Sequence, residues 1–326
     1  MKLVRQLAEI EKPFKNAVIT IGNFDGVHLG HQSLFHEVIE LSDRLKGTSV
    51  AMTFDPHPLR VLKSNSHPPL ITLNEQKIEL IEKTGIDVLI CIPFTREFGS
   101  ISAYEFVHDI LVGTIGMKAV IVGKDYSFGN KREGNVSFLK KYAGELEYEV
   151  IVADWVENNI VRFVEDNESD LNSAFTGNIR ISSTRIREMV MAGEVDKAQK
   201  LLGRNYQIRG EVVTGRNRGG KDLGFPTANI NLKDELCPKN GVYAVTVEYK
   251  GLLYKGVANI GTSPTFDDNI FTIEVHILDF NENIYGKDIR VNFIKRLRDE
   301  KKFSGISELS TQIIKDIAYA RDLLSI

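Results

Sequence analysis

The first half of the chain repeats one pattern, a short apolar run rich in β-branched residues and long enough for a single strand. The runs cover Ala17–Ile21, Ser49–Phe54, Asp87–Ile92, Lys118–Val122 and Glu149–Ala153. Their nearly continuous apolar character indicates strands buried on both faces of a parallel sheet. Between the first two runs lies an amphipathic helix, with Leu34, Val38 and Leu41 on one stripe. This strand–helix–strand rhythm predicts a doubly wound α/β domain.

The second half has a different pattern. After a helical stretch at Val195–Leu202, strand signals follow one another with glycine and polar turns between them, as in an antiparallel barrel or sandwich. The expected strands are Gln207–Val213, Gly241–Tyr249, Leu253–Ile260, Thr272–Phe280 and Asp288–Phe293. An amphipathic helix at Ile306–Leu324 closes the chain. We therefore expect two domains, residues 1–192 and 193–326, with the boundary near Gly193.

Composition fits two ordinary globular domains, because the 326 residues are 42% hydrophobic and 26% charged. The net charge of −3 gives no sign of a nucleic acid or an anionic membrane as partner. The two cysteines, Cys91 and Cys237, are far apart, which favours a reducing compartment over a disulfide framework. The N-terminus lacks the apolar segment of a signal peptide, and runs such as Val88–Pro93 are too short to span a bilayer. We expect a cytoplasmic protein without membrane or nucleic-acid partners.

The segment Gly22–Gln32, GNFDGVHLGHQ, lies where the first strand ends and the first helix begins. It permits three interpretations: a metal site, an anion site or a structural turn. Ligands of open α/β sheets bind at the carboxyl ends of strands, and a helix N-terminus there offers backbone N–H groups to a phosphate. No carboxylate or thiol joins His28 and His31 in a familiar metal-ligand pattern. The anion site is the favoured interpretation.

His28-Leu29-Gly30-His31 resembles the HxGH signature of the nucleotidylyltransferase superfamily, whose members transfer the adenylyl group of ATP. The second signature of that superfamily, ISSTxxR, is matched by Ile181–Arg187, ISSTRIR. Alone, SST before a helix is usually an N-cap; with HxGH in the same domain it favours adenylyl transfer. The resemblance implies catalytic roles for His28, His31 and Arg187. The residues that it implies for ATP binding are Gly22, Asn23, Phe24, His28, Gly30, His31, Ser182, Ser183, Thr184 and Arg187.

Two further segments, Thr53–Pro58 (TFDPHP) and Gly123–Gly129 (GKDYSFG), resemble the FMN adenylyltransferase module of prokaryotic FAD synthetases. A flat aromatic ligand needs apolar rings and a few fixed polar groups. The residues that the resemblance implies for the isoalloxazine site are Pro56, Pro58, Asp125 and Phe128. The competing interpretations are a rigid loop for the prolines and a core aromatic for Phe128.

The second half resembles riboflavin kinases in Gly215–Asn229 (GRNRGGKDLGFPTAN) and Thr272–Phe280 (TIEVHILDF). The alternation of the latter segment places Glu274 and His276 on one face of a strand. A solvated strand face is the alternative interpretation for Glu274, which the resemblance makes the catalytic base. The remaining implied residues are Gly215, Gly219 and Lys221 at the ATP phosphates, Thr227 and Asn229 at ATP and Mg²⁺, and Arg298 on the flavin side. The loop around Gly220 is one residue longer than in many bacterial members, and Ser263 replaces a frequent arginine.

Together these resemblances imply a bifunctional enzyme with a Rossmann-like nucleotidylyltransferase domain and an antiparallel β-barrel kinase domain with a C-terminal helix. Its implied substrates and products are riboflavin, FMN, FAD, ATP, ADP and pyrophosphate, with Mg²⁺ as cofactor. Three rivals compete with this prediction: an adenylyltransferase with a degenerate second domain, a non-catalytic flavin sensor, and a tRNA-linked synthetase. Intact signatures in both halves argue against the first two, and the absence of a net-basic charge argues against the third.

Overall fold

The computed structural model describes residues 1–62, 67–154, 157–158, 179–214, 224–232, 235–264 and 269–325. The chain forms two compact units, and each is described by itself. The first contains Met1–Pro68 and Leu73–Ser182; the second contains Pro69–Thr72 and Ser183–Ile326. Residues 183–192 thus group with the second unit by their contacts, while the expected domain boundary between residues 192 and 193 stays a prediction.

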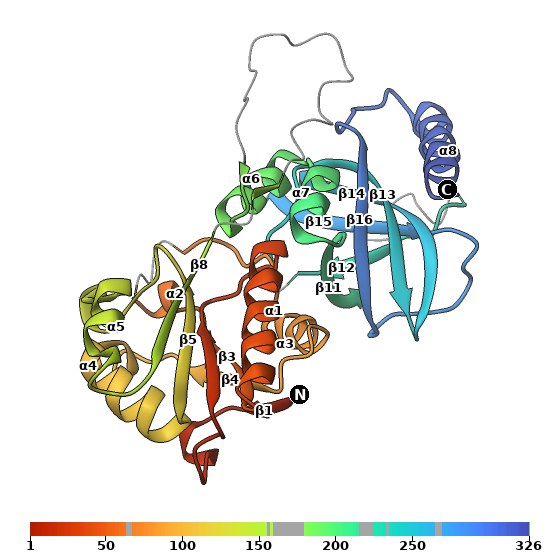
Figure 1. Cartoon of the computed structure of the whole chain (residues 1–326). Coiled ribbons are helices and arrows are strands. Elements are labelled where there is room, and N and C mark those ends of the chain that lie inside the picture. Colours follow the sequence, from red (N-terminus) through yellow and green to blue (C-terminus); the bar gives the residue numbers. More distant parts are fainter. Residues whose placement is uncertain are drawn as a thin grey trace. The chain divides into compact units, whose positions relative to one another are not determined.

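A six-stranded parallel sheet forms the centre of the first unit (Figure 1), in the order β1-β4-β3-β2-β5-β8. All five expected strands are present, and a short strand at the N-terminus joins them at one edge. The bounds are β1 Lys2–Val4, β2 Ala17–Ile21, β3 Thr48–Asp55, β4 Val88–Pro93, β5 Met117–Gly123 and β8 Glu149–Ala153. The doubly wound α/β fold predicted for this half is confirmed.

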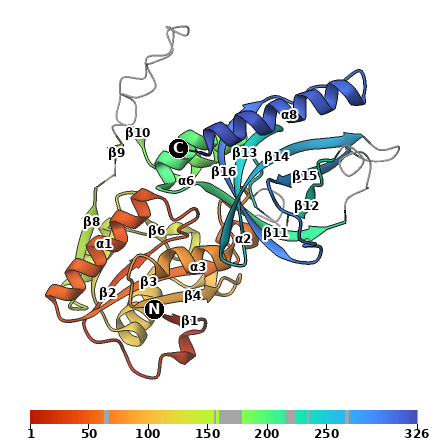
Figure 2. The same cartoon turned by 90° about the vertical axis from the view of Figure 1, so that its right-hand side faces the viewer.

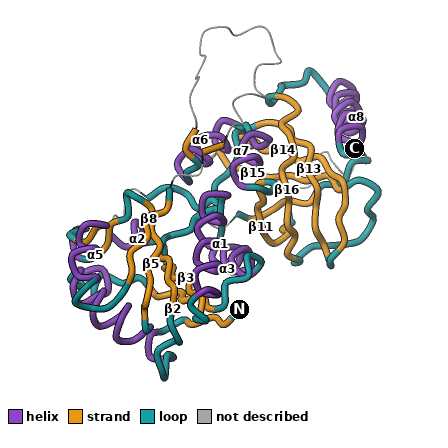
Figure 3. Tube along the Cα trace, in the orientation of Figure 1, coloured by secondary structure: helices purple, strands orange, loops and turns teal. Residues whose placement is uncertain are grey.

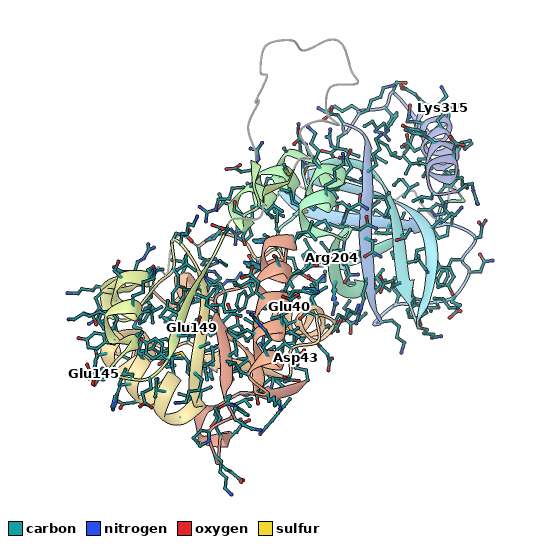
Figure 4. The ribbon with its side chains drawn as sticks, in the orientation of Figure 1. Glu40, Asp43, Glu145, Glu149, Arg204 and Lys315 are labelled. Carbon is teal, nitrogen blue, oxygen red and sulfur yellow. The ribbon has the colours of Figure 1, made fainter. Side chains whose placement is uncertain are left out.

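Helices cover both faces of this sheet, which is why its strands are apolar throughout. On one face, Val18, Ala51 and Leu89 pack against α1 and α3; on the other, Ile19 and Met52 pack against a π-helix. The bounds are α1 Leu29–Arg44, α2 Pro58–Leu62, α3 Asn74–Glu82, α4 Ala103–Glu105, the π-helix Phe106–Ile115 and α5 Val136–Ala143. The polar side of α1, which carries Glu40 and Asp43, faces solvent (Figure 4).

Short elements complete the first unit. Two small antiparallel pairs join β6 Ser127–Phe128 to β7 Gly134–Asn135 and β9 Glu157–Asn158 to β10 Ile179–Arg180. Single 3₁₀ turns cover Leu7–Glu9, Phe98–Ser100 and Asn130–Arg132.

Three sequence motifs lie at the carboxyl ends of neighbouring strands of the sheet. Strand β2 has β3 on one side and β5 on the other, so the chain changes direction of winding at β2. Crevices for ligands form outside the carboxyl ends of strands at such a switch point. GNFDGVHLGHQ follows β2, the PHP segment follows β3, and GKDYSFG follows β5. The fold therefore brings the candidate nucleotide and flavin segments together at the carboxyl ends of the strands.

The second unit is built on a closed six-stranded antiparallel barrel, in the order β11-β12-β15-β14-β13-β16. Tyr206, Tyr243 and Phe293 are among its fully buried side chains and fill its interior. The bounds are β11 Tyr206–Val213, β12 Ala228–Asn231, β13 Gly241–Tyr249, β14 Leu252–Pro264, β15 Asn269–Ile277 and β16 Asp288–Arg298. The barrel is confirmed and the alternative of a sandwich is excluded.

Two details of the barrel differ from the sequence-based expectation. Strand β12 is absent from the expected strands, although Ala228 and Asn229 pair with Val275 and Glu274 of β15. Strand β15 ends at Ile277 rather than Phe280, because Asp279 takes a left-handed backbone conformation with φ 57°. The chain therefore leaves the strand in a turn at Leu278–Asp279.

The helices found among the described residues of the second unit are α6 Ser183–Ala192, α7 Val195–Leu202 and α8 Ile306–Leu323. The C-terminal helix lies on the barrel (Figures 2 and 3), where Ala320 packs with Val242 and Val257. Within the described part of the chain, none of the helices combines the length and apolar character needed to cross a membrane.

Candidate functional site

The turn between β2 and α1 is held in an unusual backbone conformation. Phe24 and Val27 have positive φ values of 47° and 41°, on either side of Gly26 at 89°. Positive φ is uncommon for any side chain and an outlier for a β-branched one, so this turn stores strain that its surroundings offset. Strain of this kind concentrates at ligand-binding segments.

His28 is the N-cap of α1, and its ring accepts a hydrogen bond through Nδ1 from the backbone N–H of His31 at 3.3 Å. A backbone N–H only donates, so in the neutral ring the proton lies on Nε2, which is then a donor. The rings of His28 and His31 stack with their centroids 3.6 Å apart. The two histidines of the HxGH signature thus form one unit at the start of the helix.

Gly30 and Phe24 fix the geometry of this histidine pair. A Cβ on Gly30 would lie 3.2 Å from Nδ1 of His28, closer than a side chain normally approaches. The buried Phe24 ring packs edge-on against His31 at 5.3 Å and against Phe35 at 4.8 Å. Gly22, whose Cβ would clash with the Phe24 ring at 2.8 Å, and the exposed Asn23 precede it. Gly22 and Gly30 therefore make room for the rings of Phe24 and His28.

The ISSTRIR segment lies at the start of α6, as expected. Ser182 is the last residue of the first unit, whereas Ser183, Thr184 and Arg187 belong to the second. Arg187 donates through Nε to the carbonyl of Pro69 at 2.9 Å. His28 and His31 belong to the first unit. That this segment binds the same ATP as the two histidines stays a prediction.

The segment after β3 carries the candidate flavin prolines. Pro56, which follows Asp55 through a cis peptide bond, is exposed, and Pro58 begins α2. The half-buried rings of three phenylalanines gather at the carboxyl ends of β3 and β4, with centroid distances of 5.6 to 5.9 Å: Phe54, Phe94 and Phe98. The sequence analysis did not identify this cluster, because its members come from separate segments.

The other two candidate flavin residues have different surroundings. Asp125 is exposed and pairs with Arg180 at 2.7 Å. Phe128 is buried in the core, where its ring stacks on Tyr126 and contacts Phe138. This packing is what a core aromatic would show, and a flavin contact for Phe128 stays a prediction.

In the second unit, strand register brings the kinase candidates together. Asn229 of β12 lies directly opposite Glu274 of β15, and Glu274 lies opposite Asn259 of β14 on its other side. Residues directly opposite one another in antiparallel strands project from the same face. Glu274 is therefore flanked by two asparagines, of which Asn259 was missed because barrel register is not encoded locally.

Glu274 is half-buried on its strand face. Burial raises the pKa of its carboxyl above the usual range for glutamate. Ile273 and Val275 point into the barrel, so Glu274 and His276 share the opposite face, as the alternation predicts. A carboxylate with a raised pKa is a better proton acceptor for an alcohol than an exposed one.

His276 attaches the Phe225–Asn229 segment to β15. Its Nδ1 lies 2.8 Å from the carbonyl oxygen of Pro226, which only accepts, so Nδ1 carries the proton. The Phe225 ring packs edge-on against the imidazole at 5.8 Å. Thr227, the next residue, is half-buried. His276 thus fixes the backbone immediately before Thr227.

Arg298, the candidate on the flavin side, binds a carboxylate of this chain. Its guanidinium donates to both carboxylate oxygens of Asp316 on α8, at 2.7 to 3.0 Å, and lies 5.9 Å from the Phe303 ring. Bidentate pairs of this kind are strong and directional. Arg298 therefore anchors the C-terminal helix, and its contact with flavin stays a prediction.

Several candidates cannot be placed. Gly215, Gly219, Gly220 and Lys221 lie outside the described residues, as does the side chain of Ser263. Among the residues that are described, no three or more His, Cys, Asp or Glu side chains gather as a metal cluster. Thr227 and Asn229 offer neutral oxygens, which suit a Mg²⁺ ion that keeps its waters and binds phosphates.

Comparison with known protein families covers both units. The model of the FAD synthetase family matches residues 10–166, and that of the riboflavin kinase family matches residues 202–324. A bifunctional riboflavin kinase/FMN adenylyltransferase of Buchnera aphidicola subsp. Schizaphis graminum is 36% identical, over 97% of both chains. The protein of that name from Escherichia coli K12 is 35% identical, over 100% of this chain and 99% of the relative.

A solved structure shows the same two-part fold. A Streptococcus pneumoniae protein described as a macrolide-efflux protein is 32% identical and has a TM-score of 0.83, covering 98% of each chain. Similarity at this level extends over the whole length of the chain.

Proposed function

The chain belongs to the bifunctional riboflavin kinase/FMN adenylyltransferase family, and from this membership we propose which residues carry each reaction. The enzyme phosphorylates riboflavin to FMN with its C-terminal unit and adenylylates FMN to FAD with its N-terminal unit. The two steps need different chemistry, because the first attacks with an uncharged alcohol and the second with a phosphate already ionised at neutral pH.

For the kinase step, Glu274 is the general base that takes the proton of the ribityl hydroxyl as this oxygen attacks the γ-phosphorus of ATP. The observation that supports this assignment is the register of Asn229 opposite Glu274, which sets the residue proposed as a metal ligand beside the residue proposed as the base. Thr227 and Asn229 would hold Mg²⁺, which would supply positive charge to the phosphates. Gly215, Gly219 and Lys221 are proposed to contact the phosphates of ATP, and Arg298 to contribute to the flavin side.

For the adenylyl step, no base is needed, so catalysis consists of aligning the two substrates and stabilising charge on the departing pyrophosphate. His28 and His31 act as hydrogen-bond donors to the triphosphate at the N-terminus of α1. The protonated Nε2 of His28, fixed by the N-cap bond to Nδ1, supports this role. Asn23, Ser182, Ser183, Thr184 and Arg187 are the further proposed phosphate ligands.

The proposed flavin site of the first unit combines Pro56, Pro58, Asp125 and Phe128 with the Phe54, Phe94 and Phe98 cluster. Half-buried aromatic rings beside a polar edge suit the isoalloxazine ring. The substrates and products we propose are riboflavin, FMN, FAD, ATP, ADP and pyrophosphate, and the compartment is the cytoplasm, in keeping with the two distant cysteines.

A time course with riboflavin, ATP and Mg²⁺ tests the proposed function. FMN should form first and FAD should follow as FMN accumulates. FAD from supplied FMN but none from riboflavin would reduce the protein to a single-activity adenylyltransferase. Binding of flavin without any product would identify a sensor instead.

A further inference from the structure

Lys77, in the middle of α3, is a buried lysine that neither half-reaction uses. Its side chain is only 7% exposed. Removing an ammonium group from water costs several kcal/mol, so such residues persist only where the surroundings bind the charge well. The hydrogen-bond partners of Lys77 therefore indicate the role of this buried side chain.

The ammonium group of Lys77 has three donors, and each has an acceptor. Its Nζ donates to the Thr53 hydroxyl at 3.1 Å, to the Phe54 carbonyl at 3.2 Å and to the Asn23 carbonyl at 3.4 Å. The Thr53 hydroxyl itself donates to the Asn23 carbonyl at 3.2 Å, which closes the network. A single side chain thus joins the segment after β2 to the end of β3.

These two backbone positions lie near the start of the two candidate ligand segments, Gly22–Gln32 and Thr53–Pro58. The Asn23 carbonyl comes immediately before the strained turn at Phe24 that leads to the histidine pair. The Phe54 residue comes two positions before Pro56, the first candidate flavin residue of its segment. The position of one segment relative to the other therefore depends on Lys77.

The charges around Lys77 also fit a fixed ammonium ion. Burial lowers the pKa of Lys77, while the Cys91 thiol, when ionised, and the carboxylates of Asp25 and Asp55 act in the opposite direction. Burial likewise raises the pKa of Cys91, so its thiol contributes little charge at neutral pH. Asp25, itself buried, and Asp55 are the carboxylates beside Lys77 that counteract the effect of burial on its pKa.

We infer that Lys77 is a positioning residue for adenylyl transfer, because it fixes the nucleotide segment at Asn23 and the flavin segment at Phe54 relative to each other. The inference rests on the function proposed for the first unit. Attack of the FMN phosphate needs the reacting atoms about 3–3.5 Å apart and in line, and a displacement of ~1 Å costs roughly a hundredfold in rate. Lys77 holds this spacing without touching either substrate.

The decisive variant is Lys77→Met, which keeps the length and apolar stem of the side chain but removes all three donors. Steady-state kinetics of FAD formation from supplied FMN should show a kcat lowered by about tenfold or more, with smaller changes in the KM values for ATP and FMN. Riboflavin phosphorylation by the same sample should stay within about twofold of the wild type, since it occurs in the other unit. Lys83→Met, the same change at an exposed lysine at the end of α3, should leave both activities unchanged.

Two more variants separate positioning from simple stabilisation. Lys77→Arg keeps the charge and several donors and should recover part of the lost kcat. Thr53→Val removes only the hydroxyl shared by Lys77 and Asn23, and should lower kcat in the same direction by a smaller factor. If Lys77→Met fails to fold, Thr53→Val decides the question.

The inference is overturned if folded Lys77→Met has a lowered melting temperature but the wild-type kcat, which is the result expected of a purely structural lysine. It is also overturned if Thr53→Val leaves kcat unchanged. Absence of FAD formation by the wild-type protein would instead refute the function proposed for the first unit, so the two failures are distinguishable.

Discussion

At the scale of single residues, the HxGH signature combines two tasks in one imidazole. His28 caps α1 with Nδ1 and carries the proton of its neutral ring on Nε2. The first task stabilises the helix, and the second is the one that we propose for phosphate binding. Asparagine is also a good N-cap, but its short side chain cannot take the place of Nε2.

We therefore predict that His28→Asn separates the two tasks. The stability of the protein should change by less than about 0.5 kcal/mol, because the cap is retained, whereas His28→Ala should cost about 1 kcal/mol. Thermal unfolding measures this difference. FAD formation should fall by about tenfold or more in both variants, since each lacks the imidazole donor. Wild-type adenylylation by His28→Asn would refute the donor role.

Glu274 gives a prediction that links activity to stability. Its folded pKa is raised, so between the unfolded and the folded pKa the native protein binds more protons than the unfolded chain. The free energy of unfolding therefore falls as pH rises through that window, and the buried charge remains unfavourable above it. Glu274→Gln should abolish FMN formation and raise the melting temperature at pH 7.

The control for this prediction is the pH dependence itself. At acidic pH the wild-type carboxyl is neutral too, so the stabilisation by glutamine should disappear there. Melting temperatures of both proteins across the acidic range measure the effect. The prediction is contradicted if the stability of Glu274→Gln relative to the wild type is lower at pH 7 than at acidic pH. That result would show that the carboxylate stabilises the fold.

At the scale of elements, the predicted strands and helices were largely correct, because buried strands and amphipathic helices have strong periodicity. Strand β12 was missed for a physical reason: Ala228–Asn231 is short, and it is stabilised by pairing with β11 and β15, which are distant in sequence. The same non-local register places Asn259 beside Glu274. Motifs identify the candidate residues, but their neighbours depend on the folded barrel.

The link between β15 and the segment before Thr227 gives a prediction at this scale. His276→Ala removes the hydrogen bond to the Pro226 carbonyl and the contact with Phe225, so Thr227 loses its fixed position. Riboflavin phosphorylation should then need a higher Mg²⁺ concentration and have a lower kcat, by about threefold to tenfold. Activity measured against Mg²⁺ concentration tests this, with FAD formation from FMN as the internal control. An unchanged Mg²⁺ dependence would contradict it.

The burial of Lys77 could not be predicted from the sequence. Lys77 lies among glutamates in Asn74–Glu82, a composition that indicates a solvated helix face. Its burial follows from carbonyls that two other segments present only after the sheet has formed. Every residue type has a backbone carbonyl, so the sequence of the partner segment does not indicate such a hydrogen bond. Sequence patterns therefore predicted the proposed ligands but not the residue that we infer positions them.

At the scale of the whole molecule, the chain consists of two units, each with a core of its own. The proposed base of the kinase step lies in the barrel unit, and the histidine pair lies in the α/β unit. Nothing in the chemistry requires the two sites to share residues, because FMN is a complete product of one and a complete substrate of the other. The central claim of this account is that either activity can be removed without loss of the other.

A complementation experiment tests that claim most directly. A variant with His28→Ala and His31→Ala should convert riboflavin to FMN only, and Glu274→Gln should make FAD from supplied FMN but not from riboflavin. Mixing the two variants should restore FAD formation from riboflavin, because FMN released by one protein is adenylylated by the other. Loss of both activities in either folded variant would contradict the account.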